Sequence, residues 1–504
     1  MNIAPKRPMT PLINSTLKTM RQNRRQFLKT SAGFTAVALL PNLWSCTFLD
    51  SGGSGKSGDG RLPKKEAYDF VPYQPKQTAA PVMKVTPDDG YYLHTFYDVC
   101  PFSPSQRYLA VTKFPYQDRK PVLGDVAEVC VIDLKDRTIQ TVYATRAWSF
   151  QLGANVQWGA SDRYVYTNDV IDGQAVCVRI DLSSGEVKAY AGPKYDLASD
   201  GSAAIGPRLD IINATQFGYG IPDPAGRKQD WAVLDRDGKG TAHEICGPPD
   251  KNGLWFTDLE TNTKKLLVSR SRIRETIQDP NYYDKGIFHF FHSKFNKDHS
   301  RILMHIRCLL PGRRTNRHPS MWTCKSDGTE LVEFYPREKF AFKGPMGRAN
   351  HFNWHPDGEH IVANTVPYWQ GDKMMRFSMM RYDGSEYRVL APNILGSGHP
   401  TVDAETRFVL ADTYPYQTFA GARDGKVPIR LIELETQKET VICMIWNDFA
   451  TRAGYKSYRS VKGGGSQLKL DPHPAWSRDY KKICFNGAPE FKRQVFIADL
   501  SGLV

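Results

Sequence analysis

A repeated local pattern constrains this chain more than any other feature of its sequence. In the pattern, an aromatic or apolar residue precedes a tight polar turn, and the turn leads into a short apolar strand. The clearest copy is His-Phe-Asn-Trp-His-Pro-Asp-Gly, from His351 to Gly358, followed by an apolar run at 361–365. Further copies begin at Phe102, Trp158, Phe295, Val402 and Trp476. Recurrence at irregular intervals of about 50 to 75 residues predicts a radial array of structural repeats.

Hairpin ends accompany these openings. In each of seven, an apolar strand runs into a turn rich in Asp, Gly, Ser and Thr and out again; they lie at 131–137, 179–185, 255–261, 322–328, 380–385, 431–436 and 496–502. Such turns join antiparallel neighbours. With its opening pattern, each unit supplies about four strands, which is one propeller blade. We therefore predict an all-β fold, a seven-bladed β-propeller over residues 62–504.

The third unit is the weakest, because residues 213–250 contain no opening with an aromatic residue before the turn. This leaves rings of six or eight blades open as alternatives. The last hairpin ends at Val504, with no residues left for an outer strand. We expect the segment near Val82 to Val85 to supply it, so that N- and C-terminal strands close the ring and remove two exposed sheet edges.

The first 61 residues have the composition of a targeting signal followed by a flexible tether. Asn23-Arg-Arg-Gln-Phe-Leu-Lys29 followed by the apolar run 32–40 resembles a twin-arginine export signal, and the run is too short to span a bilayer. Leu43-Trp-Ser-Cys46 resembles a lipoprotein cleavage box. The Gly/Ser-rich residues behind it form a flexible linker. We expect a signal over 1–46, a tether over 47–61 and an exported, periplasmic protein whose membrane attachment is a lipid on Cys46.

Charge and cysteine usage narrow the classes of function. Residues 1–46 contain seven Lys and Arg and no acidic residue, so the formal charge of +14 falls to +7 for the remainder. That mild excess suits an anionic substrate and does not indicate nucleic acid. The nine cysteines include no Cys-x-x-Cys pair, which argues against a zinc ribbon or a redox motif and favours buried thiols.

Five of the 12 histidines share one position relative to the predicted blades. They precede the opening strands of five different units and are His94, His292, His351, His399 and His473. Ring geometry brings such positions together around the central axis. Converging imidazoles can ligate a divalent metal, although histidines that cap blade openings remain the alternative. Asp471 lies two residues before His473, so in extended backbone both side chains face the same way.

These blade openings resemble those of the oligogalacturonate lyase family, seven-bladed propellers that cleave oligogalacturonides by β-elimination at a metal site. The similarity is clearest over residues 285–504. His292, Phe295-Asn-Lys-Asp298 and His305 match its fourth-blade motif, and His351 with Trp354 matches the Gly-His-Glu-x-Trp motif of the next blade. Leu468-Lys-Leu-Asp471-Pro-His473-Pro stands where the family has Gln-x-x-His-Pro-His-Pro.

The resemblance implies roles for particular residues. The implied ligands of a divalent metal (Mn, Ca or Zn) are His351, Asp471 and His473, with Asp471 in place of a histidine. His305 is the candidate base, with Arg272 and Arg274 as further catalytic candidates. The candidates for binding substrate are Arg307, Arg313, Arg348, His292 and His399, with Arg314 and Arg317 in the same basic loop as Arg313.

The sequence therefore predicts an exported polysaccharide lyase that acts on uronate-containing oligosaccharides by metal-assisted β-elimination. A non-catalytic propeller lipoprotein of the TolB type, binding a glycan or a protein, is the first alternative. A propeller hydrolase is the second, although no Gly-x-Ser-x-Gly elbow is present for a serine peptidase.

Overall fold

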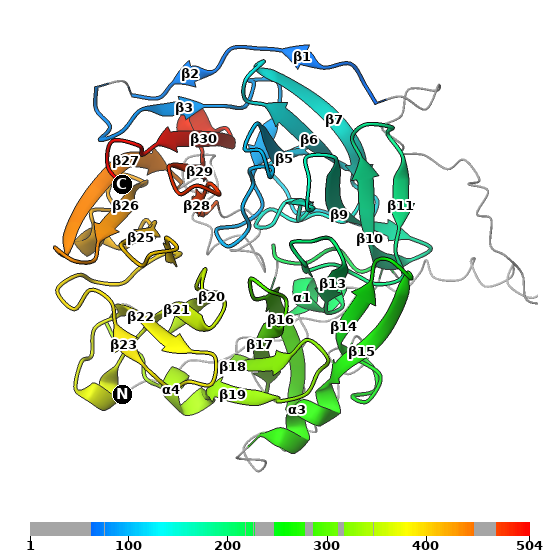
Figure 1. Ribbon diagram of the computed structural model, residues 1–504, viewed down its shortest axis with the longest axis vertical. Helices are drawn as coiled ribbons and strands as arrows, with labels where there is room; N and C mark the ends of the chain where they lie inside the picture. The colour runs from blue at the N-terminus through cyan, green and yellow to red at the C-terminus, as the bar shows by residue number, and fades with distance from the viewer. Residues whose placement is uncertain are drawn as a thin grey trace, which may run out of the picture. The chain divides into compact units, whose positions relative to one another are not determined.

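The structure is a computed structural model that describes residues 62–74, 76–216, 218–224, 226, 246–277, 286–310, 317–345, 347–447 and 470–504. Its seven antiparallel sheets are arranged around a ring (Figure 1), so the predicted seven-bladed propeller is confirmed. Among the described residues, no helix combines the length and the apolar character needed to cross a membrane.

The first three sheets use the N-terminal half of the described chain. The first is β1 (Glu66–Ala67), β7 (Thr138–Thr145), β6 (Ala127–Asp133), β5 (Tyr108–Phe114) and β4 (Tyr91–Leu93). The second is β11 (Val187–Ala189), β10 (Gln174–Asp181), β9 (Tyr164–Ile171) and β8 (Gln157–Trp158). The third is β12 (Asp196–Leu197), β13 (Ala203–Gly206), β14 (Gly253–Asp258) and β15 (Thr263–Ser269).

Four sheets complete the ring. The fourth is β16 (Ile287–Phe295), β17 (Arg301–Leu309), β18 (Arg317–Lys325) and β19 (Val332–Tyr335). The fifth is β20 (Asn350–Trp354), β21 (His360–Thr365), β22 (Arg376–Arg381) and β23 (Arg388–Val389). The sixth is β24 (Thr401–Val402), β25 (Phe408–Ala411), β26 (Lys426–Glu433) and β27 (Lys438–Trp446). The seventh is β2 (Val71–Pro72), β3 (Val82–Lys84), β30 (Gln494–Asp499), β29 (Lys482–Gly487) and β28 (Ala475–Trp476).

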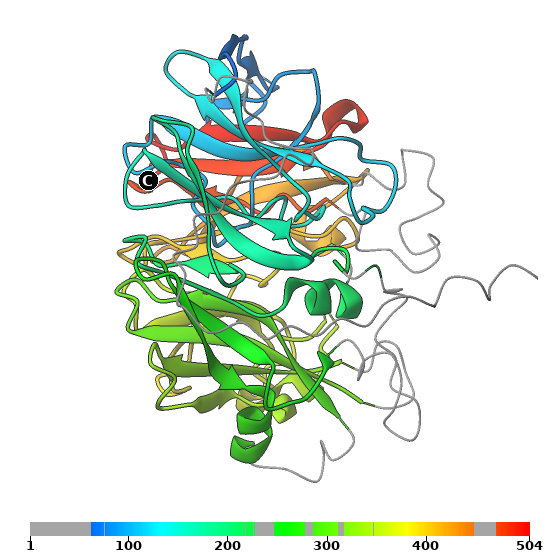
Figure 2. The same ribbon diagram turned by 90° about the vertical axis from the view of Figure 1, so that its right-hand side faces the viewer.

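Helices are short and lie between strands. Those in the described part of the chain are α1 (Leu209–Thr215), α3 (Arg270–Thr276), α4 (Arg337–Ala341) and the 3-10 turns η2 (Tyr368–Gln370), η3 (Thr418–Ala420) and η4 (Pro489–Phe491). In side view, α1 (green) and η4 (red) lie on the same face of the ring (Figure 2). Both belong to connections between the second and third strands of a blade, as do η2 and η3.

The third blade begins earlier than its weak sequence pattern indicated. Its first strands, β12 and β13, precede residue 207, and a connection containing α1 then separates β13 from β14. The blade therefore opens before residues 213–250 of the sequence, which fall between its second and third strands. The opening turn around Asp200 follows Leu197 and lies upstream of residues 213–250, where the sequence pattern places the third unit. The alternatives with six or eight blades are wrong.

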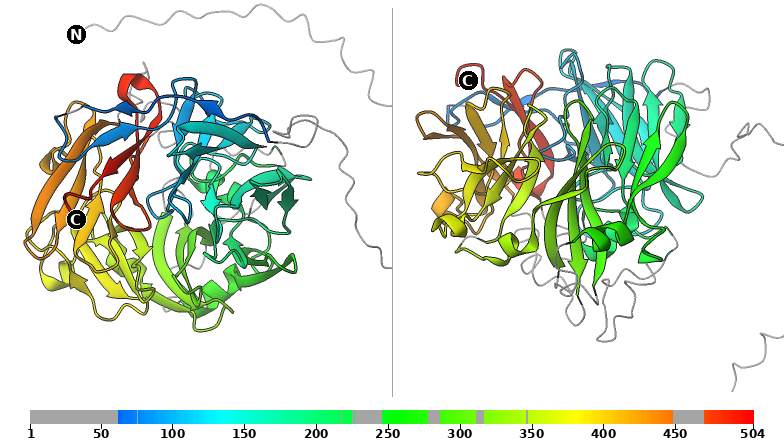
Figure 3. Two further views of the ribbon diagram at one scale, coloured as in Figure 1. Left: turned by 45° about the horizontal axis from the view of Figure 1, so that its top comes forward. Right: turned by 60° about the horizontal axis from the view of Figure 1, so that its bottom comes forward.

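The ring closes as expected. β3 pairs with β30 in the register Val82↔Ala498, Met83↔Ile497 and Lys84↔Phe496, and β2 continues the same sheet. The N-terminal strands therefore lie alongside the C-terminal ones (Figures 1 and 3). Val82 is 3% exposed and packs in the same apolar cluster as Phe485 and Phe496, so closure buries apolar surface as well as a sheet edge.

Strands near the centre of a blade are buried on both faces, because each sheet packs against two others. In β5, Leu109 and Val111 belong to one apolar cluster, whereas Ala110 and Phe114 belong to another. This division follows the alternation of side chains along a strand. The core is thus a series of layers between neighbouring sheets.

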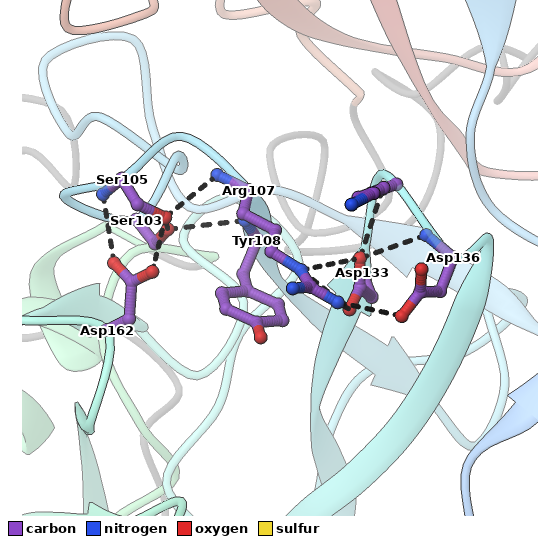
Figure 4. A network of polar contacts seen from close by, with 8 residues as sticks. Ser103, Ser105, Arg107, Tyr108, Asp133, Asp136 and Asp162 are labelled. Carbon is purple, nitrogen blue, oxygen red and sulfur yellow. Dashed lines mark hydrogen bonds and ion pairs between the residues drawn. The ribbon is translucent and has the colours of Figure 1, made fainter.

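Polar contacts between turns fix neighbouring blades to one another. Arg107 lies between Asp133 and Asp136 of its own blade, and the backbone N–H of Ser105 donates to Asp162 of the next blade at 2.9 Å (Figure 4). The last blade contacts the first in a similar way, because the Nε of Arg478 donates to the carbonyls of residues 102 and 103 at 3.2 and 3.1 Å.

Candidate active site

The five histidines lie on or beside the innermost strands of five blades. His94 follows β4, His292 lies in β16, His351 lies in β20, and His399 and His473 stand two residues before β24 and β28. The ring centroids of His351 and His399 are 4.1 Å apart, and those of His399 and His473 are 4.3 Å apart. The ring of Phe96 is 4.3 Å from His473 and 5.6 Å from His292. The structure therefore brings these side chains together at the centre.

Irregular backbone directs several of these histidines. The pairing of β16 with β17 shifts between Phe290 and His292, and that of β20 with β21 shifts between Asn350 and Asn353. His351 and His473 have φ angles of 56° and 49°, a left-handed conformation that residues with a Cβ seldom adopt. Bulges and positive φ angles turn side chains away from the regular alternation and are common beside active sites.

Three of the central residues could hold a metal ion. One ligand atom each from His399, Asp471 and His473 lies within 4.8 Å of the other two, and all three side chains are buried. Two imidazole nitrogens and a carboxylate oxygen form a donor set that suits a divalent ion such as Zn²⁺ or Mn²⁺. Asp471 and His473 therefore lie together as expected, whereas the third member is His399.

Asp412 orients this group. Its carboxylate accepts from the Nδ1 of His399 at 2.8 Å and from the backbone N–H groups of His399 and His473 at 2.8 and 3.1 Å. Because the carboxylate holds the proton of His399 on Nδ1, Nε2 is the nitrogen that can ligate. A carboxylate behind a metal-binding histidine is a common arrangement that fixes the tautomer and the direction of the ring. The donor set and its support thus fit a divalent metal.

His351, which the resemblance implied as a ligand, has a different environment. Its Nδ1 lies 2.5 Å from the carbonyl oxygen of Gly398, and its Nε2 lies 3.3 Å from the hydroxyl of Tyr414. The carbonyl can only accept, so Nδ1 bears the proton and Nε2 faces the phenol. His351 therefore lies beside the group of three and also lines the adjacent cavity.

A cavity of about 310 Å³ opens next to the metal-binding group. Its polar lining comprises Asp98, Gln216, His292, Lys294, His305, Arg307, Asn350 and His351. Apolar and aromatic lining residues include Phe96, Tyr219, Phe291, Leu303, Met321, Phe340 and Phe352. A concave apolar site with a few convergent polar groups is typical of a small-molecule pocket.

Two histidines face each other across the blade-4 strands of this cavity. His292 in β16 is in register with His305 in β17, and their rings are 6.0 Å apart at 88°. Burial lowers the pKa of His292 well below its ordinary value, with the neighbouring His305 and Arg307 acting in the same direction. His292 is therefore neutral and able to accept or donate a hydrogen bond near neutral pH.

Fixed charges line the same cavity. The Arg307 guanidinium lies 3.5 Å over the ring of Phe291, and its Nη1 donates to Gln216 at 2.5 Å. Lys294 forms a buried ion pair with Asp98, with Nζ 3.0 Å from Oδ1. Burial raises the pKa of Asp98 although Lys294 opposes this effect. The cavity thus presents the Arg307 guanidinium to a ligand, whereas the Lys294 ammonium is paired with Asp98 in its lining.

Other sequence-predicted residues lie elsewhere. Arg272 and Arg274 are on α3 and do not line the cavity, and Arg348 is exposed one residue before the lining residue Ala349. Arg313 and Arg314 lie outside the described residues, as do Leu468 and the side chain of Arg317.

The sequence reasoning missed Asp412, Lys294 and Asp98. Lys294 had a signal, because it stands two residues after His292 in a strand and therefore shares its face. No local sequence pattern indicated Asp412, since it follows β25 and comes within hydrogen-bond distance of His399 only when the blade folds.

Comparisons with known proteins bear on the fold. No protein-family model matches the sequence, and no curated protein matches it either. An oligogalacturonate lyase solved in complex with manganese matches with a TM-score of 0.57 and 16% identity, covering 87% of this chain and 98% of that one. The oligogalacturonate lyase of Vibrio parahaemolyticus matches with a TM-score of 0.56 and 13% identity over the same shares. The protein thus shares the seven-bladed fold of the oligogalacturonate lyase structures.

Proposed function

We propose that the protein is an exported polysaccharide lyase that cleaves uronate-containing oligosaccharides by metal-assisted β-elimination. The observation that supports this most directly is the buried group of His399, Asp471 and His473 beside a cavity lined by His305, Arg307 and Lys294. The similar lyase structure adds support, because it has the same fold and was solved in complex with manganese, a divalent cation.

The chemistry sets three requirements. A base must take the proton on the carbon next to the uronate carboxylate. The bond from the adjacent carbon to the glycosidic oxygen must break as a carbon–carbon double bond forms between the two carbons, with the leaving oxygen taking up a proton. The carboxylate must also be neutralised, because proton loss places further negative charge on it. A cation held by His399, Asp471 and His473 would supply positive charge for that carboxylate.

Residues of the cavity fit the remaining roles. His305 is the proposed base, because it lines the cavity from β17 and an imidazole can accept a proton near neutral pH. The Arg307 guanidinium, held by Gln216 and Phe291, suits binding of a second substrate carboxylate. Neutral His292, facing His305, suits a hydrogen bond to a sugar hydroxyl.

The test is an assay for unsaturated uronate products. Purified protein would be incubated with oligogalacturonates and other uronate oligosaccharides after loading with Mn²⁺, Ca²⁺ or Zn²⁺, and ultraviolet absorbance and mass spectrometry would follow the product. His305→Ala and His473→Ala should each lower turnover by about 100-fold or more. His360→Ala is the control, because His360 pairs with Asp357 and Glu386 at the start of β21 and does not line the cavity.

The proposal fails if the folded, metal-loaded wild-type protein forms no unsaturated product from any member of the panel. Saturable binding of the same oligosaccharides without turnover would instead support the alternative of a non-catalytic glycan-binding propeller. Turnover that survives His473→Ala would contradict the role given to the metal-binding group.

We further propose export with a lipid on Cys46, on the basis of Arg24-Arg25, the apolar run 32–40 and the Gly/Ser-rich segment that follows. Replacement of both arginines by lysine should retain the precursor in the cytoplasm. Cys46→Ser should release an exported protein from the membrane fraction. Unchanged fractionation of both variants would contradict the proposal.

A further inference from the structure

An aromatic stack leads from the cavity to the protein surface. The hydroxyl of Tyr414 is 3.3 Å from the Nε2 of His351, which lines the cavity. The ring of Tyr416 lies parallel to that of Tyr414, with centroids 5.5 Å apart and an interplanar angle of 1°. Tyr416 is 60% exposed. The two rings therefore connect the candidate active site with an aromatic surface in contact with solvent.

The stack has a fixed base. Tyr414 donates its backbone N–H to the Oε1 of Gln417 at 3.0 Å, and the hydroxyl of Ser397 donates to the same oxygen. Gln417 is 2% exposed and precedes η3. The inner ring is also close to the metal-binding group, since its centroid is 5.8 Å from that of His399. These contacts hold the platform in place before a ligand arrives.

The location suits a continuation of the substrate site. The connection between β25 and β26, which bears both tyrosines, joins the second and third strands of its blade, as does the connection with Gln216 and Tyr219 of the cavity lining. The centroid spacing from His351 to Tyr414 is 6.3 Å and that from Tyr414 to Tyr416 is 5.5 Å. Tyr416 therefore lies two ring contacts away from a residue that lines the cavity.

We propose that the exposed face of Tyr416 is a subsite for a further sugar ring of the acidic oligosaccharide, beyond the rings held in the cavity. A pyranose ring presents C–H groups on its face and polar groups at its edge. The C–H face packs on the electron-rich face of a tyrosine while the hydroxyl and carboxylate groups stay in water. This inference rests on the proposed function and assigns to it a preference for longer chains.

A protein or membrane partner fits these observations less well. Such partners bind contiguous apolar surfaces of roughly several hundred Å². Among the described residues of this connection, the large hydrophobic side chains that are exposed are Tyr416 and Phe419, and they are separated by the buried Gln417 and the polar Thr418. Trp369, 39% exposed on the next blade, packs instead against Tyr387 at 5.0 Å, with the ammonium of Lys339 5.3 Å over its ring.

The experiment compares substrates of increasing length. In Tyr416→Ala, kcat/KM for oligogalacturonates longer than the shortest cleaved substrate should fall about tenfold, because the stacking contact is lost. The value for the shortest substrate should not change. Tyr416→Trp should restore the preference for longer chains. Phe419→Ala is the matched control, because Phe419 is 46% exposed in the same connection but outside the Tyr414–Tyr416 pair.

The same variants separate this inference from the proposed function. If the wild-type protein binds oligogalacturonates without cleaving them, calorimetric titration with chains of two to six sugars (roughly the length that cavity and platform could span) replaces the assay. Tyr416→Ala should then weaken binding of the longer chains alone. An equal loss at all lengths, no loss at any length, or an equal effect of Phe419→Ala would overturn the subsite. A wild-type protein that neither binds nor cleaves these chains overturns both proposals.

Discussion

Asp412 and Asp471 lie at the same centre but have different surroundings. Asp412 accepts three hydrogen bonds from the backbone and side chain of the histidine segments. Asp471 is instead grouped with His399 and His473, and the buried Arg493 lies near enough to have its own pKa affected by it. One carboxylate thus supports the histidines from behind, and the other belongs to the group that could ligate an ion.

The different environments of His351 and His399 lead to a testable difference. We expect His399→Ala to abolish stoichiometric metal binding, because it removes one of three grouped donors, whereas His351→Ala should retain stoichiometric binding with a loss in affinity of about 10-fold at most. Metal content by mass spectrometry and titration of the metal-free protein with Mn²⁺ and Zn²⁺ would measure this. Loss of metal in His351→Ala with retention in His399→Ala would restore the ligand set implied by the family resemblance.

Lys194, which lies outside the candidate active site, should make the stability of the fold depend on pH. Its ammonium is buried and donates to the carbonyl of Asn155 at 2.7 Å and to Gln157 at 3.2 Å. Burial lowers its pKa to about 7, from an ordinary value of about 10.4. Between these values the unfolded chain binds more protons than the folded one. Lys194 therefore makes the free energy of unfolding increase with pH over this window, by at most about 1.4 kcal/mol per pH unit.

Denaturant unfolding at pH 7, 8 and 9 would test this dependence, because these values lie within the window from about pH 7 to about pH 10.4. The increase in stability with pH should be smaller in Lys194→Met than in the wild type. Lys135→Met, at an exposed turn, should leave the slope unchanged. Identical slopes for wild type and Lys194→Met would contradict the lowered pKa.

At the scale of elements, the irregular starts of the innermost strands position the site. Regular alternation would direct His351 and its neighbours to fixed faces of β20, but the shift between Asn350 and Asn353 changes this. Before β24, Gly398 has a φ of 59°, and its carbonyl accepts from both His351 and Asn364. The segment before the strand thus organises two of the central histidines.

Gly398 should be intolerant of a side chain. A Cβ at this position would lie 2.0 Å from the carbonyl oxygen of Asp412, in addition to the strain of positive φ. Gly398→Ala should destabilise the protein by about 3 kcal/mol or more. Gly371→Ala is the control, because φ is 84° there but nothing lies within 4 Å, so about 1 kcal/mol is expected. Equal melting temperatures for the two variants would show that the close contact is relieved.

At the scale of the molecule, closure joins segments from the two ends of the described chain. β3 covers β30, so the seventh blade is complete only with N-terminal residues. Without β3, the backbone groups of β30 and the apolar cluster around Phe496 would be exposed. Every blade packs against two neighbours, so loss of the contacts that complete the seventh blade should destabilise the whole ring.

Deletion of residues 1–85 should therefore lower the melting temperature by about 10 °C or more and promote aggregation. Deletion of residues 1–61 is the control, because it leaves all described strands in place. Calorimetry and light scattering would measure both effects. A single unfolding transition at the same temperature in both deletions would contradict a stabilising role for β3.

The sequence alone determined the propeller class, the closing strand and the shared position of the five histidines, and it favoured seven blades over six or eight. These follow from local rules, because turn residues and strand alternation act over a few neighbouring residues and each blade repeats them. The third blade was counted, but its opening was placed within 213–250 instead of at the turn around Asp200.

Only the tertiary structure decided which side chains meet. His399 and not His351 joins Asp471 and His473, Asp412 supports them, and Lys294 pairs with Asp98 in the lining of the cavity. These groupings depend on β-bulges and on residues with left-handed backbone angles, which turn a side chain from one face of the sheet to the other. They also join residues from different blades, whose distances are set by the closure of the ring and not by their separation in the sequence.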